Sequence, residues 1–304
     1  MKLSWYITKP SRIVLALASR GLMPFISDKC YLNMYYREKT GKNIDFVAPK
    51  LFGEKMQWLK LYDHNPKYVT MVDKYAAKTY VAERIGVEHT IPTIGVWEAF
   101  DDIDFNMLPN QFVLKCTHDS GGIVICRDKK TFDIELAKKR IEKCLGHNYY
   151  YAGREWPYKD VHPRVIAEEY LEDCSTTELR DYKFFCFNGE PAYCQVISNR
   201  TSAETIDFYD MSWNHQVFTG LGLPSKPFSN AVISKPLTFE QMVCYSRILS
   251  SGIPFLRVDF YEVNGKLYFG ELTFYPASGF GEFTPNEWNK KLGDMIVLPK
   301  TERK

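Results

Sequence analysis

The chain has 304 residues, of which 45% are hydrophobic, 15% aromatic and 25% charged, and its formal net charge is +2. This composition excludes a disordered chain, and so small a net charge gives no electrostatic indication of nucleic-acid binding. The 8 cysteines include no C-x-x-C pair, so we predict reduced thiols and neither disulfides nor a structural metal site.

A short apolar run near the N-terminus, residues 13–18, superficially resembles a signal peptide. It is far shorter than the roughly 20 residues that cross a bilayer, so we predict a cytoplasmic chain without a membrane span. The apolar residues that follow, up to Ile26, are expected to pack in the core. Peripheral contact with the inner face of a membrane is the alternative.

The first part of the chain has helical periodicity. Residues 31–62 carry apolar side chains at three- and four-residue spacing, and Pro49 is the expected start of the helix that runs to Tyr62. A second helix is predicted over residues 69–86, which places Lys74 in its first turn. Because a cation is unfavourable at that end of a helix, Lys74 is either solvated or directed at an anion.

A glycine-containing loop separates two strands predicted in the middle of the chain. Residues 111–115 are expected to form a buried strand that ends at Lys115, and residues 123–126 the returning strand. Gly121 and Gly122 between them would let backbone N–H groups approach phosphate oxygens. Neither a Walker loop nor a dinucleotide fingerprint is present, and taken alone such a loop is more often a plain hairpin.

The most informative stretch is residues 255–272, which predict a β-hairpin around an Asn-Gly turn at 264–265. Period-two alternation puts Arg257 and Asp259 on one face of its first strand, and Glu271 on the returning strand can face the same way. Convergent carboxylates beside a cation suit Mg²⁺ that carries phosphate. A solvated charged face is the alternative.

The remaining elements come in blocks. Helices are predicted at residues 133–145 and 237–250, and strands at 165–171, 181–189 and 191–198, the last two joined by a second Asn-Gly turn. Strands therefore dominate two separate regions of the sequence, which follow a helical N-terminal part. This arrangement favours an α+β chain with at least two lobes.

The order of these features resembles the ATP-grasp superfamily, and several phrases are similar to its teichuronopeptide-biosynthesis (TupA-like) branch. The phrases lie at residues 54–62, 73–76, 108–115, 154–158, 166–171 and 181–189. The resemblance implies an ATP-grasp fold in which two β-rich lobes clamp ATP. In that fold, residues 1–87 would form a helical N-terminal region, 88–167 the small lobe with a glycine flap, and 168–304 the large lobe with the metal-binding hairpin.

The same resemblance implies roles for individual residues. The ATP phosphates would contact Lys74, Lys115 and, as a further candidate, Lys183. The flap over them would consist of Asp119, Ser120, Gly121 and Gly122. The adenine and ribose would be bordered by Glu168, Glu169, Tyr170 and Leu171. Arg257, together with Lys115 and Lys183, would act on the transferred phosphoryl group, and the Mg²⁺ ligands would be Asp259, Glu271 and Thr273.

The predicted metal strand departs from the family's pattern at one position. The family usually has Glu-x-Asn there, whereas this chain has Glu271, Leu272 and Thr273. A hydroxyl is a weaker metal ligand than an amide oxygen. Either water takes that place or a second Mg²⁺ is held less tightly, so the number of metal ions stays open.

The resemblance implies an ATP-dependent carboxylate–amine ligase that forms an amide through an acylphosphate. Its expected partners are a small-molecule amine, an amino acid or amino alcohol, and a uronic acid of a surface polysaccharide or of its lipid-linked precursor. The aromatic stretch 149–158 either faces a sugar or packs structurally.

Three other functions compete with this one. The first is a kinase of the same fold that phosphorylates a sugar hydroxyl. The second is a sugar-nucleotide glycosyltransferase, although residues 207–210 have the wrong spacing for its D-x-D metal site. The third is a non-catalytic nucleotide-binding partner, against which Lys74, Lys115, Asp259 and Glu271 argue.

Overall fold

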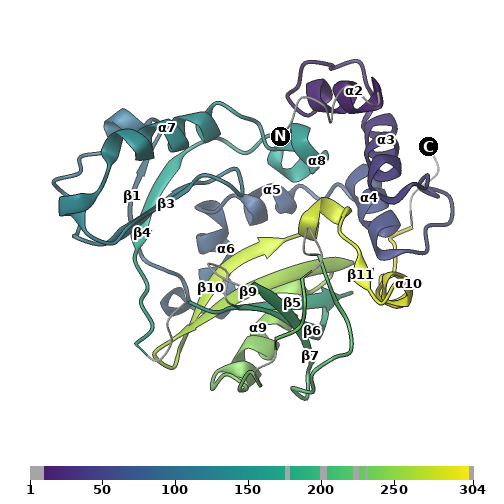
Figure 1. The fold of residues 1–304 in the computed structure, drawn as a ribbon. Coiled ribbons are helices and arrows are strands. Elements are labelled where there is room, and N and C mark those ends of the chain that lie inside the picture. The colour runs from purple at the N-terminus through teal and green to yellow at the C-terminus, as the bar shows by residue number, and fades with distance from the viewer. Residues whose placement is uncertain (1–9, 175–178, 199–203, 222–225, 230–231, 301–304) are drawn as a thin grey trace.

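The computed structural model of the chain describes residues 10–174, 179–198, 204–221, 226–229 and 232–300. Its N-terminal helices α2 (Pro10–Ala18), α3 (Asp28–Thr40) and α4 (Phe52–Tyr62) lie at one end of the molecule (Figure 1). Gly41, at φ 76°, ends α3 because it can adopt the left-handed conformation. The helical stretch predicted over residues 31–62 is therefore two helices.

The N-terminal apolar residues divide between core and surface. Leu15 and Ala18 pack in a small core with residues of α3. Met23 and Ile26 pack against this core, as predicted for the residues up to Ile26. Leu22 and Phe25 are instead 64% and 78% exposed. Among the helices of the described residues, none has the length and hydropathy that crossing a bilayer would demand.

The single helix predicted over residues 69–86 is wrong, because the chain forms α5 (Lys67–Val72) and α6 (Ala76–Ile85) with a break between them. Asp73 makes the break stable. Its carboxylate accepts hydrogen bonds from the N–H groups of Tyr75 (2.9 Å) and Ala76 (3.2 Å), which caps the start of α6. Lys74 thus lies in the connection between two helices and not in the first turn of one.

The smaller sheet belongs to the middle of the chain. It comprises β1 (Thr93–Trp97), β2 (Phe112–Cys116), β3 (Ile123–Cys126) and β4 (Val165–Glu169) in the order β1-β4-β2-β3, all antiparallel. Helix α7 (Ile134–Leu145) packs against β2 and β3 and completes a separate hydrophobic core. The boundary expected after residue 167 falls inside β4, which continues to Glu169.

The larger sheet holds the predicted hairpin. It comprises β5 (Asp181–Phe187), β6 (Glu190–Ser198), β7 (Thr205–Asp210), β9 (Phe255–Val263) and β10 (Lys266–Thr273) in the order β10-β9-β5-β6-β7. Both Asn-Gly turns are confirmed, since Asn188, Gly189, Asn264 and Gly265 all have positive φ. Helix α9 (Phe239–Ser250) packs across β5, β6 and β9, while α5 and α6 contact the edge strand β10.

Short elements complete the described chain. They are α8 (Tyr150–Gly153), α10 (Glu287–Asp294), the paired strands β8 (Thr219–Gly220) and β11 (Phe283–Thr284), and the 3-10 helices η1 (Val87–His89), η2 (Phe100–Asp102), η3 (Lys129–Thr131), η4 (Trp156–Tyr158) and η5 (Pro276–Gly279). The helices α5 and α6 lie between the two sheets (Figure 1). Helix α6 contacts both sheets, since Lys78 pairs with Glu168 of β4 and the helix packs against β10.

Candidate active site

A cluster of two lysines and one glutamate lies on the smaller sheet. The Nζ of Lys115, on β2, is 2.5 Å from Oε2 of Glu168 on the adjacent strand β4. The Nζ of Lys78, on α6, contacts the other carboxylate oxygen and also donates to the carbonyl of Ile91 (2.6 Å) and the hydroxyl of Thr93 (2.7 Å). One carboxylate thus links the sheet to the helix.

The charges of this cluster stabilise one another. Burial alone would raise the pKa of Glu168, which is 3% exposed, but the charges of Lys115 and Lys78 outweigh burial and lower it below its usual value. Burial in turn lowers the pKa of Lys78. Two lysines and one ionised glutamate leave an excess of one positive charge. Such an excess suits a ligand that carries negative charge.

A second cluster lies on the larger sheet, where Lys183, Asp259 and Glu271 stand opposite one another on β5, β9 and β10. The guanidinium of Arg257 donates to both carboxylate oxygens of Asp259 (2.7 Å each) and, through Nη2, to Oε1 of Glu271 (2.9 Å). Nη2 also donates to the hydroxyl of Thr273 (3.0 Å). Arg257 therefore contacts every residue predicted to bind Mg²⁺.

The lysine of the second cluster is buried among acids. Lys183 contacts Asp259 and lies 3.5 Å from a carboxylate oxygen of Asp181. Asp259 is 1% exposed, and burial raises its pKa despite the cations beside it. Among the side chains named here, three carboxylates outnumber two cations by one. That excess is opposite in sign to the excess at the smaller sheet.

Glu271 is the accessible acid of the second cluster, with 41% of its side chain exposed. Desolvation opposes its ionisation, but the charges of Arg257, Lys183 and Lys74 lower its pKa to about 2. Glu271 is therefore a carboxylate at neutral pH. It is also open enough to accept a metal ion.

The glycine flap, residues 119–122, is tied to the helices by hydrogen bonds. The N–H of Lys74 donates to the carbonyl of Thr117 (3.0 Å), and its Nζ donates to the carbonyl of Asp119. Asp119 accepts from the N–H of Gly122 (3.0 Å) and so closes the loop on itself. Ser120 and Gly121 form the exposed tip. Lys74 accordingly holds the base of the flap.

Lys74 also reaches the second cluster. Together with Glu271 and Tyr158, it lines a cavity of about 20 Å³, enough room for a water molecule. This cavity is where the lysine from the first half of the chain and an acid from the far end approach each other. The predicted convergence of these two groups is present in the structure, although their roles stay predictions.

The aromatic stretch 149–158 lies over the same place. The rings of Tyr149 and Tyr158 are 4.8 Å apart, and the hydroxyl of Ser120 in the flap donates to that of Tyr149 (3.2 Å). The charge of Glu155 and burial raise the pKa of Tyr149, to which Glu271 contributes as well. These tyrosines therefore stay protonated near the flap and Glu271.

The residues expected to border the adenine lie at the end of β4 and in the connection to β5. Among them only Glu168 is buried, and Glu169 is exposed, with its N–H bonded to the carbonyl of Pro92 (3.1 Å). Tyr170 and Leu171 are partly exposed. These residues follow the smaller sheet directly, so they lie next to the cluster of Lys115 and Glu168.

The acids of the hairpin suit Mg²⁺ better than a metal held by protein alone. No group of three or more His, Cys, Asp or Glu side chains within the described ranges is arranged to hold a metal ion. Mg²⁺ commonly takes one or two carboxylates and completes its shell with phosphate oxygens and water. Asp259 and Glu271 can supply those carboxylates if Arg257 yields part of its contacts.

Comparison with known proteins agrees with this geometry. The model of the TupA-like ATP-grasp family matches residues 54–297, which include both charged clusters and the flap. The chain belongs to the TupA-like ATP-grasp family. Among curated proteins, none matches the sequence.

Solved structures of ATP-grasp proteins also align with this TupA-like chain. D-alanine–D-alanine ligase from Bacillus anthracis, complexed with ATP, is 19% identical over 67% of this chain and 54% of its own, with a TM-score of 0.37. The ATP-grasp ligase PsnB, complexed with minimal precursor, Mg and ADP, is 10% identical over 73% and 57%, with a TM-score of 0.35. The chain thus spans little more than half the length of either protein.

Two site residues of this TupA-like chain escaped sequence reasoning. Lys78 follows Lys74 by four residues, a spacing that places side chains on one face of a helix. Asp181 precedes Lys183 by two residues, which puts both on one face of β5. Either spacing is a usable signal. Neither was decisive, because the partners Glu168 and Asp259 are distant in the sequence.

Proposed function

We propose that this chain is an ATP-dependent ligase that joins a carboxylate to an amine through an acylphosphate. The observation that carries the proposal is the pair of clusters with opposite excess charge, linked by Lys74 beneath a glycine flap. A triphosphate with its metal ion has negative charge along the phosphates and positive charge at the metal. The two clusters match that distribution.

The residues have distinct tasks in the proposed reaction. Lys115, Lys74 and Lys183 would neutralise the phosphates as the substrate carboxylate attacks the γ-phosphorus and the bond to ADP breaks. Arg257 would stabilise negative charge on the transferred group, and afterwards on the tetrahedral carbon formed when the amine attacks. The carbon–oxygen bond to phosphate then breaks and the amine loses a proton. Mg²⁺ at Asp259 and Glu271 would supply further charge neutralisation.

The flap and the tyrosines above Glu271 would exclude water from this reaction. An acylphosphate hydrolyses readily, so a site that forms one has to be closed while the amine attacks. Ser120 bonded to Tyr149 brings the flap tip onto the aromatic stretch. The aromatic stretch 149–158 was expected either to face a sugar or to pack structurally. Its position beside the flap supports a part in closing the site.

We further propose that the acid is a uronic acid of a surface polysaccharide or its lipid-linked precursor, and the amine an amino acid or amino alcohol. Membership of the TupA-like family supports this assignment. A lipid-linked precursor would place the protein at the inner face of a membrane. The exposure of Leu22 and Phe25 supports such contact.

The decisive experiment is a screen for ADP release, with each uronic acid tested alone and with each amine of a panel. The proposal expects one phosphate and one ADP per turnover, only with acid and amine together, and a product whose mass is their sum minus water. ADP release with a sugar alone, accompanied by a stable phosphorylated sugar, would identify a kinase. Nucleotide binding without turnover for any pair would favour the non-catalytic alternative.

A further inference from the structure

A groove with a volume of about 470 Å³ lies on the outer face of α5 and α6. Its lining residues on α6 include Ala76, Tyr80 and Glu83. At 3.6 residues per turn these point about half a turn away from Lys78, which binds Glu168 on the other face of the helix. The groove is therefore separate from the two charged clusters, and the proposed reaction leaves it without a role.

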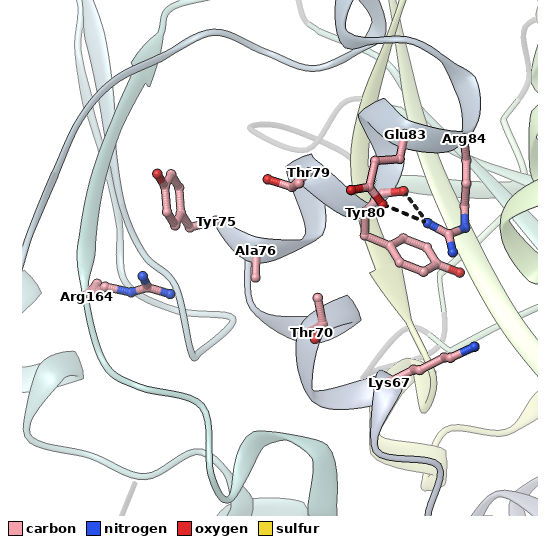
Figure 2. Close-up of a pocket in the computed structure, with 9 residues that line it drawn as sticks. All are labelled: Lys67, Thr70, Tyr75, Ala76, Thr79, Tyr80, Glu83, Arg84 and Arg164. Carbon is pink, nitrogen blue, oxygen red and sulfur yellow. Dashed lines mark hydrogen bonds and ion pairs between the residues drawn. The ribbon is translucent and has the colours of Figure 1, made fainter.

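The groove has a floor of small residues between two groups of large ones (Figure 2). Thr70, Ala76 and Thr79 form the floor. Arg164 and Tyr75 stand at one end. The other end is made by Tyr80, Arg84 and Lys67. Because Arg164 comes from the segment just before β4, the groove spans the junction between the helices and the smaller sheet.

Both guanidinium groups are held in place before any ligand arrives. Arg84 lies over the ring of Tyr80 at 3.6 Å and donates to the Tyr80 carbonyl (2.8 Å). Arg164 lies over the ring of Tyr75 at 5.0 Å and donates to Asp73 (2.7 Å). A stacked arginine loses little freedom on binding and still offers a planar fork of N–H donors.

The balance of charge in the groove is positive. Lys67, Arg84 and Arg164 face two carboxylates, Glu83 in the groove and Asp73 behind Arg164, which leaves one excess positive charge. Glu83 lies 3.7 Å from Arg84, too far for a strong hydrogen bond. Within the part of the chain that the structure describes, Lys67 has no ion-pair partner. An anion would thus find donors at both ends.

We propose that this groove binds carboxylate-bearing sugar residues of the acceptor glycan that flank the reacting residue. The inference rests on the proposed function, because an enzyme that modifies an anionic polymer has to hold more of it than one sugar. Guanidinium groups pair with carboxylates in a bidentate way. The exposed hydroxyls of Thr70 and Thr79 between them are suited to sugar hydroxyls, and a lone phosphate would fill only a small part of the volume.

The groove is also close enough to the reaction site to serve one chain. Tyr75 follows Lys74 directly, and Asp73, which precedes Lys74, binds Arg164. A helix with its side chains is about 10 Å across, so a few sugar residues reach from one face of α6 to the other. Residues of the glycan on the outer face would therefore anchor the one that reaches the γ-phosphate.

The test uses a galacturonic acid hexamer and the monomer as probes, and the double variant Lys67→Gln/Arg84→Gln. Both residues are exposed, so the variant should fold, and Arg164 is kept because it supports Asp73. The control is Arg247→Gln, an exposed arginine on α9 that pairs with Glu190 at 2.8 Å. Calorimetry should show the hexamer bound about tenfold more weakly by the double variant, with the control unchanged.

Turnover separates this inference from the proposed function. If ADP is released, the double variant should raise KM for the hexamer about tenfold at unchanged kcat, and leave the monomer unaffected. If the wild type releases no ADP with any pair, the proposed function fails, and hexamer binding alone decides the role of the groove. Equal hexamer affinity in the wild type and the double variant would overturn the proposed role of the groove. If inorganic phosphate displaced the bound hexamer as readily as the monomer does, the assignment of the groove to sugar carboxylates would be overturned.

Discussion

The two charged clusters of this protein both pair cationic side chains with carboxylates, in opposite proportion. On the smaller sheet, Lys115 and Lys78 enclose the single carboxylate of Glu168. On the larger sheet, three carboxylates surround Arg257 and Lys183. Each cluster compensates most of its own charge, so each can be buried. Among the side chains named here, cations outnumber carboxylates by one on the smaller sheet, and carboxylates outnumber cations by one on the larger sheet.

The difference shows how a fold can stay stable and still bind a strongly charged ligand. A fully unpaired cluster would destabilise the free protein, because buried charges require partners. A fully paired cluster would have no excess charge with which to attract a ligand. An excess of a single charge in each cluster is a compromise between the two, and it gives each sheet a preference for a different part of a metal-bound triphosphate.

Removal of the accessible acid should have the largest effect. Glu271→Ala takes the excess negative charge from the larger sheet, and we expect turnover to fall more than a hundredfold while the fold is kept. ADP release, followed across a Mg²⁺ titration, measures this. Glu287→Ala, an exposed acid at the start of α10, is the matched control. Near-wild-type ADP production by Glu271→Ala would show that the metal site is assigned wrongly.

The two lysines that pair with Glu168 should differ. Lys115→Ala removes one of the two cations that pair with Glu168, and we expect about a hundredfold loss of turnover. Lys78 also binds the carbonyl of Ile91 and the hydroxyl of Thr93, so its main task is to hold Glu168. Lys78→Ala should lower turnover only about tenfold. A larger loss from Lys78→Ala than from Lys115→Ala, in the same assay, would reverse the assignment of the two lysines.

Local patterns predicted four of the five strands of the larger sheet, all except β7, because the information for those four is local. Alternation along β9 puts Arg257 and Asp259 on one face, as the sequence indicated. Uninterrupted alternation from the Asn264-Gly265 turn would place Gly270 opposite Asp259. A β-bulge between Phe269 and Glu271 brings Glu271 there instead, and local patterns did not predict that bulge. The ATP-grasp fold followed from the order of such motifs along the chain. The metal and nucleotide roles of these residues are not fixed by their proximity, and they stay predictions.

What the sequence concealed depends on tertiary contacts. The break between α5 and α6 escaped prediction because its apolar spacing continues through residues 69–86, and only the capping by Asp73 reveals it. Lys78 was missed because its partner Glu168 is 90 residues away and reaches it through sheet packing. The groove was hidden for the same reason, since Arg164 meets α6 only in the folded chain.

The buried carboxylate of the smaller sheet should matter more for stability than for chemistry. Glu168→Gln leaves Lys115 and Lys78 without a counter-charge, and we expect a loss of about 2 kcal/mol in the free energy of unfolding. Denaturant unfolding at neutral pH measures it. Glu169→Gln, on the exposed neighbouring residue, should change the free energy of unfolding by less than about 0.5 kcal/mol.

The same variant tests the pKa of Glu168. The folded protein lowers that pKa below its ordinary 4.5, so Glu168 contributes stability that is fully present above pH 4.5 and lost as the pH falls through the folded value. The wild type should therefore lose more stability on acidification below pH 4.5 than Glu168→Gln does. Parallel pH profiles of the two proteins would show that the lysines do not stabilise the ionised form.

The smallest effect is expected at the position where this chain departs from its family. Thr273→Asn introduces an amide oxygen, a better Mg²⁺ ligand than a hydroxyl, beside Glu271. The hydroxyl now accepts a hydrogen bond from Arg257 (3.0 Å), which the amide oxygen can also accept. We expect the Mg²⁺ concentration for half-maximal ADP release to fall two- to threefold, roughly 0.5 kcal/mol, with little change in maximal turnover. Thr273→Ser, which keeps the hydroxyl, should match the wild type. A requirement for more Mg²⁺ in Thr273→Asn would mean that this position binds Arg257 and not the metal, and that Asp259 and Glu271 are the only hairpin residues left to hold the ion.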